Sequence, residues 1–404
     1  MRICHICCSF PPLIGGTETH NYSIVKYLSK QGYDVDVIVI IDKIELLKKT
    51  GYSKNIIDEV HKKEYSLPEL ENVRIYSIPC PKPLIGYYQI WKKVKDIEKK
   101  HGKFDVLDVH AYPSAIPFSK KRKIILSLHS FELTCPHPIR PIPCNSSLKN
   151  CSKCVGYFRY FYWKITKNLA LEKISKIMIK YNFLIEKLIE DGIDENKLVL
   201  VPHWIVADKF NQGNKKKTSN PIKNIQANDF VFGVLGRLDA FKGVANILKA
   251  FHLLTTKYNN IKLLFIGGGE LKDELMNYSV INNINNQVIF TGYVDHDDLS
   301  KYVSTVNVFI HASTYDNYNW SLLETMYFKK SIIATNVGGT KEILTDEYNS
   351  LLAEPTIHSL TQKMKMILDN PEFAKKIAEN AYATVKEKHS MKNLEKYEKL
   401  LRDV

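Results

Sequence analysis

The sequence contains no run of about 18 apolar residues, which is the length that a membrane-spanning helix requires. Its opening residues, MRICHICCSF, lack the basic start, apolar core and small-residue cleavage site of a secretory signal peptide. We therefore expect a cytoplasmic protein that is at most peripherally attached to the inner face of a membrane. In that compartment the eight cysteines would be mostly thiols or metal ligands rather than a disulfide framework.

Two common nucleotide-binding fingerprints are also missing. Neither GxGxxG nor GxxxxGKS/T occurs, so nicotinamide-dependent and ATPase functions lose their usual support. The formal charge of +14 suits polyanionic partners, or it reflects a solvated surface rich in lysine. A nucleic-acid-binding protein is a rival interpretation of this charge. The sequence carries no recognition motif and its basic residues are scattered, so we expect no nucleic-acid partner.

The length of 404 residues, with 45% hydrophobic and 25% charged residues, is typical of a globular protein with two domains. Residues 2–10, 17–32 and 33–41 carry the patterns of a strand, a helix and a second strand around a glycine-rich loop. That order is one βαβ unit, which implies a parallel sheet with helical crossovers. The same order restarts at residue 230, so we predict two α/β domains.

A polar stretch that contains proline and glycine, residues 210–229, lies between these halves and marks a connection. We place one domain at residues 1–208 and a second at 209–385, followed by a C-terminal helix at 386–404 that returns to the first domain. Doubly wound domains bind ligands at the carboxyl ends of their strands, so the cleft between the two domains is the expected site.

Two loops that follow predicted strands have the chemistry of a phosphate site. In GRLDAFKG, Arg237 and Lys242 are two cations beside a predicted helix start, which suits a diphosphate. Alone, such cations are more often ordinary solvated residues. The glycine turn at Gly267 and Gly268 allows close approach of a ligand, but it serves equally well as a tight connection between strand and helix.

The stretch TYDNYNWSLLETM sets two carboxylates, Asp316 and Glu324, eight positions apart around a loop rich in asparagine and aromatic residues. Ser321 and Glu324 fit a capping box, in which the glutamate only satisfies the start of a helix. Alternatively, the helix directs its positive end and this glutamate toward a polyhydroxylated, phosphorylated ligand. The pattern by itself leaves both interpretations open.

Segments along nearly the whole chain resemble the retaining glycosyltransferases of family 4 (glycosyl transferases group 1), which have the GT-B fold of two facing Rossmann-like domains. In order, the segments are GGTETH, LSLHSFELTCP, VPHWIVADKF, GVLGRLDAFKG, FIGGGE, TGYVDHDDLSKYV and DNYNWSLLETMYFKKSIIATNVGGTKEIL. The resemblance implies that the N-terminal domain lies on the acceptor side and that the C-terminal domain binds a nucleotide sugar.

The resemblance also implies roles for the matching residues. Arg237 and Lys242 would hold the donor diphosphate, and Glu324 the nucleotide ribose. Asp316 stands where the family normally has glutamate and would contact the donor sugar hydroxyls. Because aspartate is one methylene shorter, the loop must sit closer or the sugar must differ. The other donor-binding candidates are Gly15, Gly16, Gly267, Gly268, Tyr293, Asn317, Asn319, Trp320 and Ser321.

In the N-terminal domain, His129 matches a family histidine near the anomeric centre, where an imidazole can hydrogen-bond a sugar hydroxyl. From its own setting after a predicted strand, it would more often be a structural residue. Further acceptor-side candidates are Glu18, His20 and His110. The catalytic candidates are His129, Asp316, Arg237 and Lys242.

The mechanism that the resemblance implies is retention without a protein nucleophile. The acceptor hydroxyl attacks on the face that the diphosphate leaves, and a diphosphate oxygen takes the proton. Arg237 and Lys242 would stabilise the developing charge. The resemblance further implies that catalysis requires no cofactor or metal ion.

Four cysteines, Cys135, Cys144, Cys151 and Cys154, have the spacing C-x8-C-x6-C-x2-C. Four thiolates can close a tetrahedral zinc site, although only one C-x2-C pair is present. We hypothesise a small structural zinc knuckle, with free thiols or disulfides as the alternatives.

Aromatic and basic residues are interleaved after these cysteines, in YFRYFYWKITK at residues 157–167. Such a helix suits a membrane interface, where rings lie at headgroup level and cations meet anionic lipid. The alternative is a helix packed into its own domain. The aromatic residues run almost continuously round the helix, so some of them must be exposed or covered by another element.

These patterns together predict a hexosyltransferase that moves a sugar, with retention, from a UDP- or GDP-sugar to a glycan or lipid-linked saccharide. We expect it to work at an anionic membrane surface in polysaccharide biosynthesis. Two alternatives keep the same fold. One is the same activity on a soluble acceptor, and the other is a catalytically inactive homologue that only binds the nucleotide sugar, which the aspartate at 316 makes credible.

Overall fold

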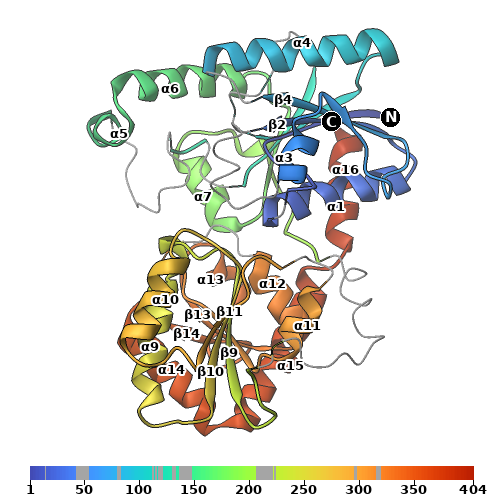
Figure 1. Ribbon diagram of the computed structural model, residues 1–404. Helices are drawn as coiled ribbons and strands as arrows, with labels where there is room; N and C mark the ends of the chain where they lie inside the picture. The colour runs from blue at the N-terminus through green and yellow to red at the C-terminus, as the bar shows by residue number, and fades with distance from the viewer. Residues whose placement is uncertain are drawn as a thin grey trace. The chain divides into compact units, whose positions relative to one another are not determined.

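The structure is a computed structural model of the 404-residue chain (Figure 1). It describes all residues except 14, 42–53, 80–82, 112, 114–115, 117–121, 130–132, 136–147, 206–221, 223, 295–297 and 315–319. The chain divides into two compact units. The first is Met1–Pro202 together with Lys392–Val404, and the second is His203–Met391.

The first unit contains an eight-stranded sheet in the order β3-β4-β2-β1-β5-β6-β7-β8, parallel except for the pair of β3 and β4. Its strands are β1 (Arg2–Cys7), β2 (Asp34–Ile41), β3 (Glu64–Tyr65), β4 (Val73–Pro79), β5 (Val106–His110), β6 (Lys123–Ser127), β7 (Lys176–Ile179) and β8 (Leu198–Leu200). Every residue of β1 is buried, so both faces of the sheet are covered at its centre.

The helices of this unit are α1 (Gly16–Lys30), α3 (Lys54–Val60), α4 (Pro83–His101), α5 (Leu148–Val155), α6 (Tyr157–Leu171), α7 (Asn182–Glu190) and α16 (Lys392–Asp403). The helix α1 ends at Lys30, two residues before the predicted end at Gly32, which has a φ of 80°. The amide of Tyr33 closes this end by donating to the carbonyl of Leu28 at 3.1 Å.

The last helix, α16, belongs to the first unit and lies beside α1 (Figure 1). The hydroxyls of Tyr27 and Tyr33 each donate to the carboxylate of Glu398 at 2.8 Å. Arg402 donates to the Tyr33 hydroxyl at 2.8 Å. These bonds join the C-terminal residues to the start of the chain.

The second unit contains a six-stranded parallel sheet in the order β11-β10-β9-β12-β13-β14. The strands are β9 (Phe230–Leu235), β10 (Ile261–Ile266), β11 (Val288–Phe290), β12 (Val308–His311), β13 (Ser331–Thr335) and β14 (Leu351–Ala353). The helices are α9 (Val244–Thr255), α10 (Lys272–Ile281), α11 (Leu299–Ser304), α12 (Trp320–Tyr327), α13 (Thr340–Ile343), α14 (Ile357–Asp369) and α15 (Pro371–Lys388).

Both sheets are doubly wound, which confirms the predicted α/β class with two Rossmann-like domains. In the first sheet the chain runs outward from β1 in one direction and from β5 in the other. In the second sheet the same reversal falls between β9 and β12. Ligands of doubly wound sheets bind outside the carboxyl ends of the strands at such a reversal. Each unit therefore has one expected binding position.

Candidate functional site

In the second unit, the loop between β9 and α9 carries Arg237 and Lys242 at the reversal of the sheet. The guanidinium of Arg237 lies 3.2 Å from the carboxylate of Asp239, and its side chain is 72% exposed. An ion pair this exposed is weak, so it does not compete strongly with an anionic ligand. The other carboxylate oxygen of Asp239 accepts from the backbone amide of Lys242 at 3.1 Å and holds the loop in shape.

This loop packs against the residues that follow β12. The amide of Thr314 donates to the carbonyl of Phe241 at 2.9 Å. Gly243 has a φ of 64°, and a Cβ there would lie 2.1 Å from the carbonyl oxygen of Ala312. Glycine is therefore the residue that fits, and it allows α9 to begin next to the end of β12.

The glycine turn after β10 packs on the same loop. The amide of Leu238 donates to the carbonyl of Gly268 at 2.9 Å, and a Cβ at Gly267 would lie 2.0 Å from the carbonyl oxygen of Gly236. A Cβ at Gly268 would lie 2.6 Å from the ring of Tyr293. These glycines are thus explained by packing between loops. Contacts of Gly267, Gly268 and Tyr293 with a donor remain predictions.

The helix α12 begins beside the Arg237 loop. The Ser321 hydroxyl oxygen lies 3.9 Å from the position that a Cβ on Gly236 would take. Because α12 begins at Trp320, Ser321 lies within its first turn and not at its N-cap, so the capping-box interpretation does not fit. Trp320 and Glu324 are each 6% exposed. Asp316, Asn317 and Asn319 lie outside the described residues.

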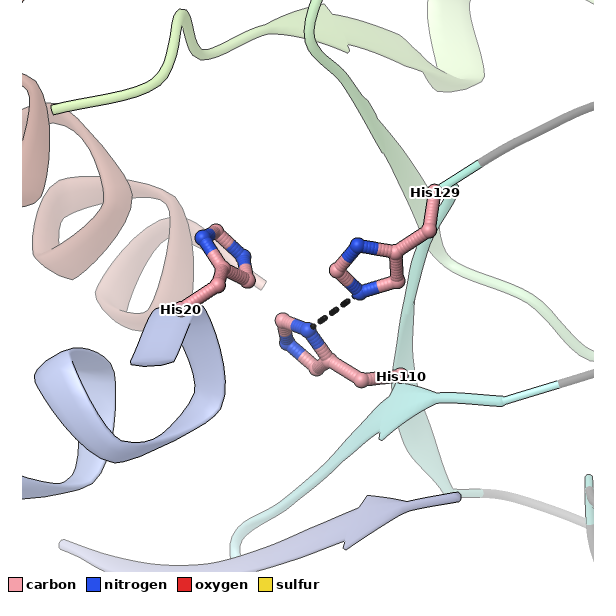
Figure 2. Close-up of side chains that lie close together, drawn as sticks. All are labelled: His20, His110 and His129. Atoms are coloured by element: carbon pink, nitrogen blue, oxygen red, sulfur yellow. Dashed lines mark hydrogen bonds between the residues drawn. The ribbon is translucent and has the colours of Figure 1, made fainter. Parts of the chain in front are cut away.

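In the first unit, the predicted residues His20, His110 and His129 lie together at the reversal of the sheet (Figure 2). His110 ends β5, His129 follows β6, and His20 is on α1. The Nδ1 of His110 and the Nε2 of His129 are hydrogen-bonded at 3.1 Å. The ring centroid of His20 lies 5.5 Å from that of His110 and 5.0 Å from that of His129.

A buried carboxylate, Asp108, accepts hydrogen bonds beside these rings. It accepts hydrogen bonds from His5 Nδ1 at 2.7 Å, from His110 Nε2 at 3.1 Å and from the hydroxyl of Tyr397 on α16. Burial alone would raise the pKa of Asp108, but the His110 imidazole and the hydrogen bonds from His110 and His5 hold it below its usual value. The carboxylate is therefore ionised and acts only as an acceptor.

The ionised carboxylate determines the tautomers of both histidines. Since the Nε2–H of His110 donates to Asp108, the Nδ1 of His110 is an acceptor, and the Nε2–H of His129 donates to it. The Nδ1 of His129 then has no proton and can accept a hydrogen bond. Burial lowers the pKa of His110 to about 4 and that of His129 well below its usual value, so both rings are neutral near pH 7.

A lysine, Lys180, lies near this cluster directly after β7, and its pKa is strongly shifted. It is 4% exposed, and burial lowers its pKa to about 7 although the charge of Asp108 acts in the opposite direction. Its charge in turn lowers the pKa values of His110 and His129. The cluster thus combines one carboxylate, one lysine and the two neutral imidazoles of His110 and His129.

The start of α1 carries the remaining candidates of this unit. Gly15 precedes the helix, Gly16 is its first residue, and Glu18 lies in its first turn. A Cβ at Gly15 would lie 2.3 Å from a carboxylate oxygen of Glu18, so this side chain lies over the glycine loop. The carboxylate is favourable there because a helix N-terminus carries a partial positive charge.

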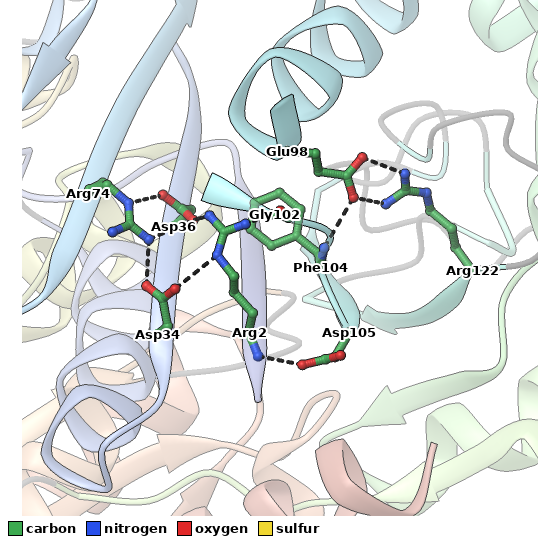
Figure 3. A network of polar contacts seen from close by, with 9 residues as sticks. All are labelled: Arg2, Asp34, Asp36, Arg74, Glu98, Gly102, Phe104, Asp105 and Arg122. Atoms are coloured by element: carbon green, nitrogen blue, oxygen red, sulfur yellow. Dashed lines mark hydrogen bonds and ion pairs between the residues drawn. The ribbon is translucent and has the colours of Figure 1, made fainter. Parts of the chain in front are cut away.

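A second polar cluster lies at the opposite edge of the first sheet and has no such chemistry (Figure 3). Arg2 and Arg74 bracket Asp34 and Asp36 at the amino ends of β1 and β2, with Arg2 Nε 2.9 Å from Asp34 and Arg74 Nε 2.6 Å from Asp36. Glu98 and Arg122 form a bidentate pair at 2.5 and 2.6 Å. Each charge is matched within the cluster, so we assign it to stability.

The helix α6 has one packed face and one exposed apolar face. Tyr160, Thr166 and Ala170 are buried. The exposed face is made of Tyr157, Phe158, Phe161, Ile165 and Leu169, of which Phe158 is 95% exposed. Some of the aromatic residues are therefore exposed, as the sequence requires. Among the described helices, none is both long and apolar enough to cross a membrane.

Of the four cysteines in the hypothesised zinc knuckle, Cys135, Cys151 and Cys154 are thiols and none of the three forms a disulfide. Cys151 is buried, and the other two are partly exposed. Cys144 lies outside the described residues. The zinc knuckle stays a hypothesis.

Two family models match the chain and together run from residue 14 to residue 384. Glycosyltransferase Family 4 matches residues 14–209, and Glycosyl transferases group 1 matches residues 215–384. The chain therefore belongs to the glycosyltransferases, with a family 4 domain followed by a group 1 domain. Among curated relatives, an uncharacterized glycosyltransferase of Methanocaldococcus jannaschii is 26% identical over 96% of this chain and 95% of its own length. The capsular polysaccharide biosynthesis glycosyltransferase CapM of Staphylococcus aureus is 24% identical over 58% of this chain and 62% of its own.

Solved structures similar to this glycosyltransferase have the GT-B fold. Sucrose-phosphate synthase from Thermosynechococcus elongatus matches with a TM-score of 0.73 and 17% identity, over 100% of this chain and 98% of that one. HepE from Anabaena, in complex with UDP-glucose, matches with a TM-score of 0.71 and 16% identity over 100% of both chains. At these identities the likeness establishes the fold of this glycosyltransferase.

Sequence reasoning missed four residues of the histidine cluster: His5, Asp108, Lys180 and Tyr397. The first three are polar residues in or just after apolar strands, which is the signal that was available. Tyr397 is 289 residues from Asp108, so no local pattern joins the two.

Proposed function

We propose that this glycosyltransferase moves a hexose, with retention, from a UDP- or GDP-sugar to a glycan or lipid-linked saccharide. The observation that carries the proposal is the loop after β9, which carries Arg237 and Lys242 at the reversal of the sheet and lies beside the start of α12 at Gly236. Two cations beside helix N-termini suit a diphosphate. The UDP-glucose bound to HepE, a protein of the same fold, supports this choice of donor.

In the proposed reaction the acceptor hydroxyl attacks the anomeric carbon on the face from which the diphosphate leaves. A leaving diphosphate oxygen takes the proton of this hydroxyl, so the step needs no protein nucleophile and no metal ion. Arg237 and Lys242 stabilise the negative charge that develops on the diphosphate. We assign the nucleotide ribose to Glu324, which is nearly buried on α12, and the donor sugar hydroxyls to Asp316.

His129 is proposed to orient a sugar hydroxyl near the anomeric centre. The tautomer set by Asp108 and His110 leaves its Nδ1 as an acceptor, so a hydroxyl can donate to it. Asp108 and Tyr397 act through His110 and are positioning residues. Glu18 and His20 remain candidates for the acceptor side.

The proposal places the acceptor at the cytoplasmic face of a membrane, with the exposed face of α6 as the contact surface. The exposed side chains Phe158 and Ile165 are apolar, and Arg159 and Lys164 beside them are also exposed. Apolar groups with flanking cations suit an anionic lipid interface.

Flotation with anionic liposomes tests the membrane part. Ile165→Asp should reduce flotation, whereas Ile281→Asp, at a residue that is 78% exposed on α10, should not. If the unmodified protein does not float with the vesicles, the acceptor is soluble and this part is wrong.

A panel of UDP- and GDP-sugars, assayed by thermal shift and by donor hydrolysis, tests the central proposal. At least one donor should raise the melting temperature. Lys242→Ala should reduce this shift, and Lys249→Ala, at an exposed position on α9, should leave it unchanged. If no nucleotide sugar stabilises the protein, the proposal fails. Binding without hydrolysis or transfer would instead support an inactive homologue.

A further inference from the structure

The three histidines of the cluster have the geometry of a metal site. His20, His110 and His129 each offer one ring nitrogen, and these nitrogens all lie within 4.8 Å of one another (Figure 2). The Nδ1 of His110 and the Nε2 of His129 are 3.1 Å apart, and both can bind a metal ion when His129 carries its ring proton on Nδ1 instead of Nε2. Tetrahedral zinc with Zn–N bonds of about 2.0–2.1 Å needs ligand nitrogens roughly 3.4 Å apart, so small side-chain movements would close the set.

His110 also has the partner that metal-binding histidines usually have. Its Nε2–H donates to Asp108, and its Nδ1 is the nitrogen directed toward His129. A carboxylate behind a ligand histidine fixes the tautomer and makes the ligand nitrogen more basic. Asp108 is itself held by His5 and Tyr397, so this support is rigid.

The surroundings of the cluster allow a divalent cation to bind. His20 and His110 are 1% and 2% exposed, and His129 is partly exposed, which gives an ion a route to the rings. The positive charge of Lys180 would repel a metal ion, and the negative charge of the buried Asp108 offsets this repulsion.

We propose that His20, His110 and His129 form a binding site for a divalent transition metal ion, with zinc as the ion that best suits three imidazoles and one open position. This site is distinct from the four-cysteine segment. One consequence rests on the proposed function: a metal ion on Nε2 of His129 leaves the ring proton on Nδ1, which can then no longer accept from a sugar hydroxyl, so zinc should inhibit transfer.

Cobalt titration of the full-length apo protein tests the site without any activity measurement. We expect one equivalent of Co²⁺ with the visible bands of tetrahedral coordination and without the near-ultraviolet sulfur-to-cobalt band that thiolate ligands give. His20→Gln and His129→Gln should each lose this equivalent. The matched control is His358→Gln, at an exposed histidine of α14, which should keep it. Asp108→Asn should weaken binding by about 10- to 100-fold.

Circular dichroism melting shows which variants fold. Because His20 and His129 lie on different elements, one of the two variants still tests the site if the other fails to fold. The proposal is overturned if the wild-type protein binds no cobalt, binds it only with the sulfur band, or loses nothing in either folded variant. A donor hydrolysis assay with added zinc separates the two proposals. If the protein binds cobalt but does not react with any nucleotide sugar, the proposed function is wrong and the metal site stands. If the protein reacts with a nucleotide sugar but binds no cobalt, the metal site is wrong and the proposed function stands.

Discussion

Replacing Tyr397 by phenylalanine tests the link between the C-terminal helix and the histidine cluster. Tyr397 and Asp108 are both 0% exposed, and the hydroxyl donates to the carboxylate. A hydrogen bond to a charged group contributes about 1.5–3 kcal/mol. Phenylalanine keeps the ring, so little packing is lost. We therefore expect the free energy of unfolding to fall by about 2 kcal/mol.

This loss should not depend on pH between about 5 and 8. The folded pKa of Asp108 is held below that of the unfolded chain, about 3.9. Its contribution to stability is therefore present above the unfolded pKa and is lost only as the pH falls toward the folded value. A difference between wild type and Tyr397→Phe that changes between pH 5 and 8 would point to the histidines instead.

Urea unfolding followed by circular dichroism measures the effect, and Tyr27→Phe is the matched control. The Tyr27 hydroxyl donates to Glu398 of the same helix at 2.8 Å from a partly exposed position, so we expect a loss of about 0.5–1 kcal/mol. Equal losses in the two variants, or wild-type stability of Tyr397→Phe, would refute the reasoning. In Tyr397→Phe the turnover number should fall more than KM for the donor rises, because the change acts on the orientation of His129.

Three further predictions concern other parts of the chain. Gly32→Ala should lower the free energy of unfolding by about 1–2 kcal/mol, and Gly243→Ala should lower it at least twice as much, as measured by urea unfolding. Both glycines have a positive φ, but an added Cβ clashes with a backbone carbonyl only at Gly243. Asp36→Asn should lower the free energy of unfolding by about 3–5 kcal/mol, because Arg2 and Arg74 then lose the fully buried carboxylate that pairs with both of them. A variant as stable as the wild type in urea unfolding would contradict this. Glu324→Gln should weaken donor binding about tenfold in calorimetry, the loss expected for one charged hydrogen bond to a ribose hydroxyl, with a melting temperature close to that of the wild type.

Local sequence patterns were sufficient for several of the strands and helices. The strand that ends at Leu235, the loop with Arg237 and Lys242, and the helix that follows could all be predicted because residues close in sequence determine hydrophobic periodicity and turn chemistry. The candidate histidines were instead identified from the resemblance of their segments to the family 4 glycosyltransferases.

The capping box at Ser321 shows how such patterns fail. A serine followed three residues later by glutamate satisfies the local rule, but α12 begins at Trp320, so Ser321 is its second residue and not its N-cap. A cap contributes only about 1 kcal/mol, which is too little to decide by itself where a helix begins.

By itself the sequence determined the α/β class and the positions of the glycine-rich and basic loops, and its resemblance to a known family predicted which residues act in sugar transfer. Only the tertiary structure decided that Asp108 accepts from His5, His110 and Tyr397, and that three histidines from α1, β5 and the end of β6 share one space. The physical reason is that periodicity and turns depend on neighbours along the chain. Tautomers, shifted pKa values and metal-binding geometry depend on buried groups that the order of the parallel strands brings together.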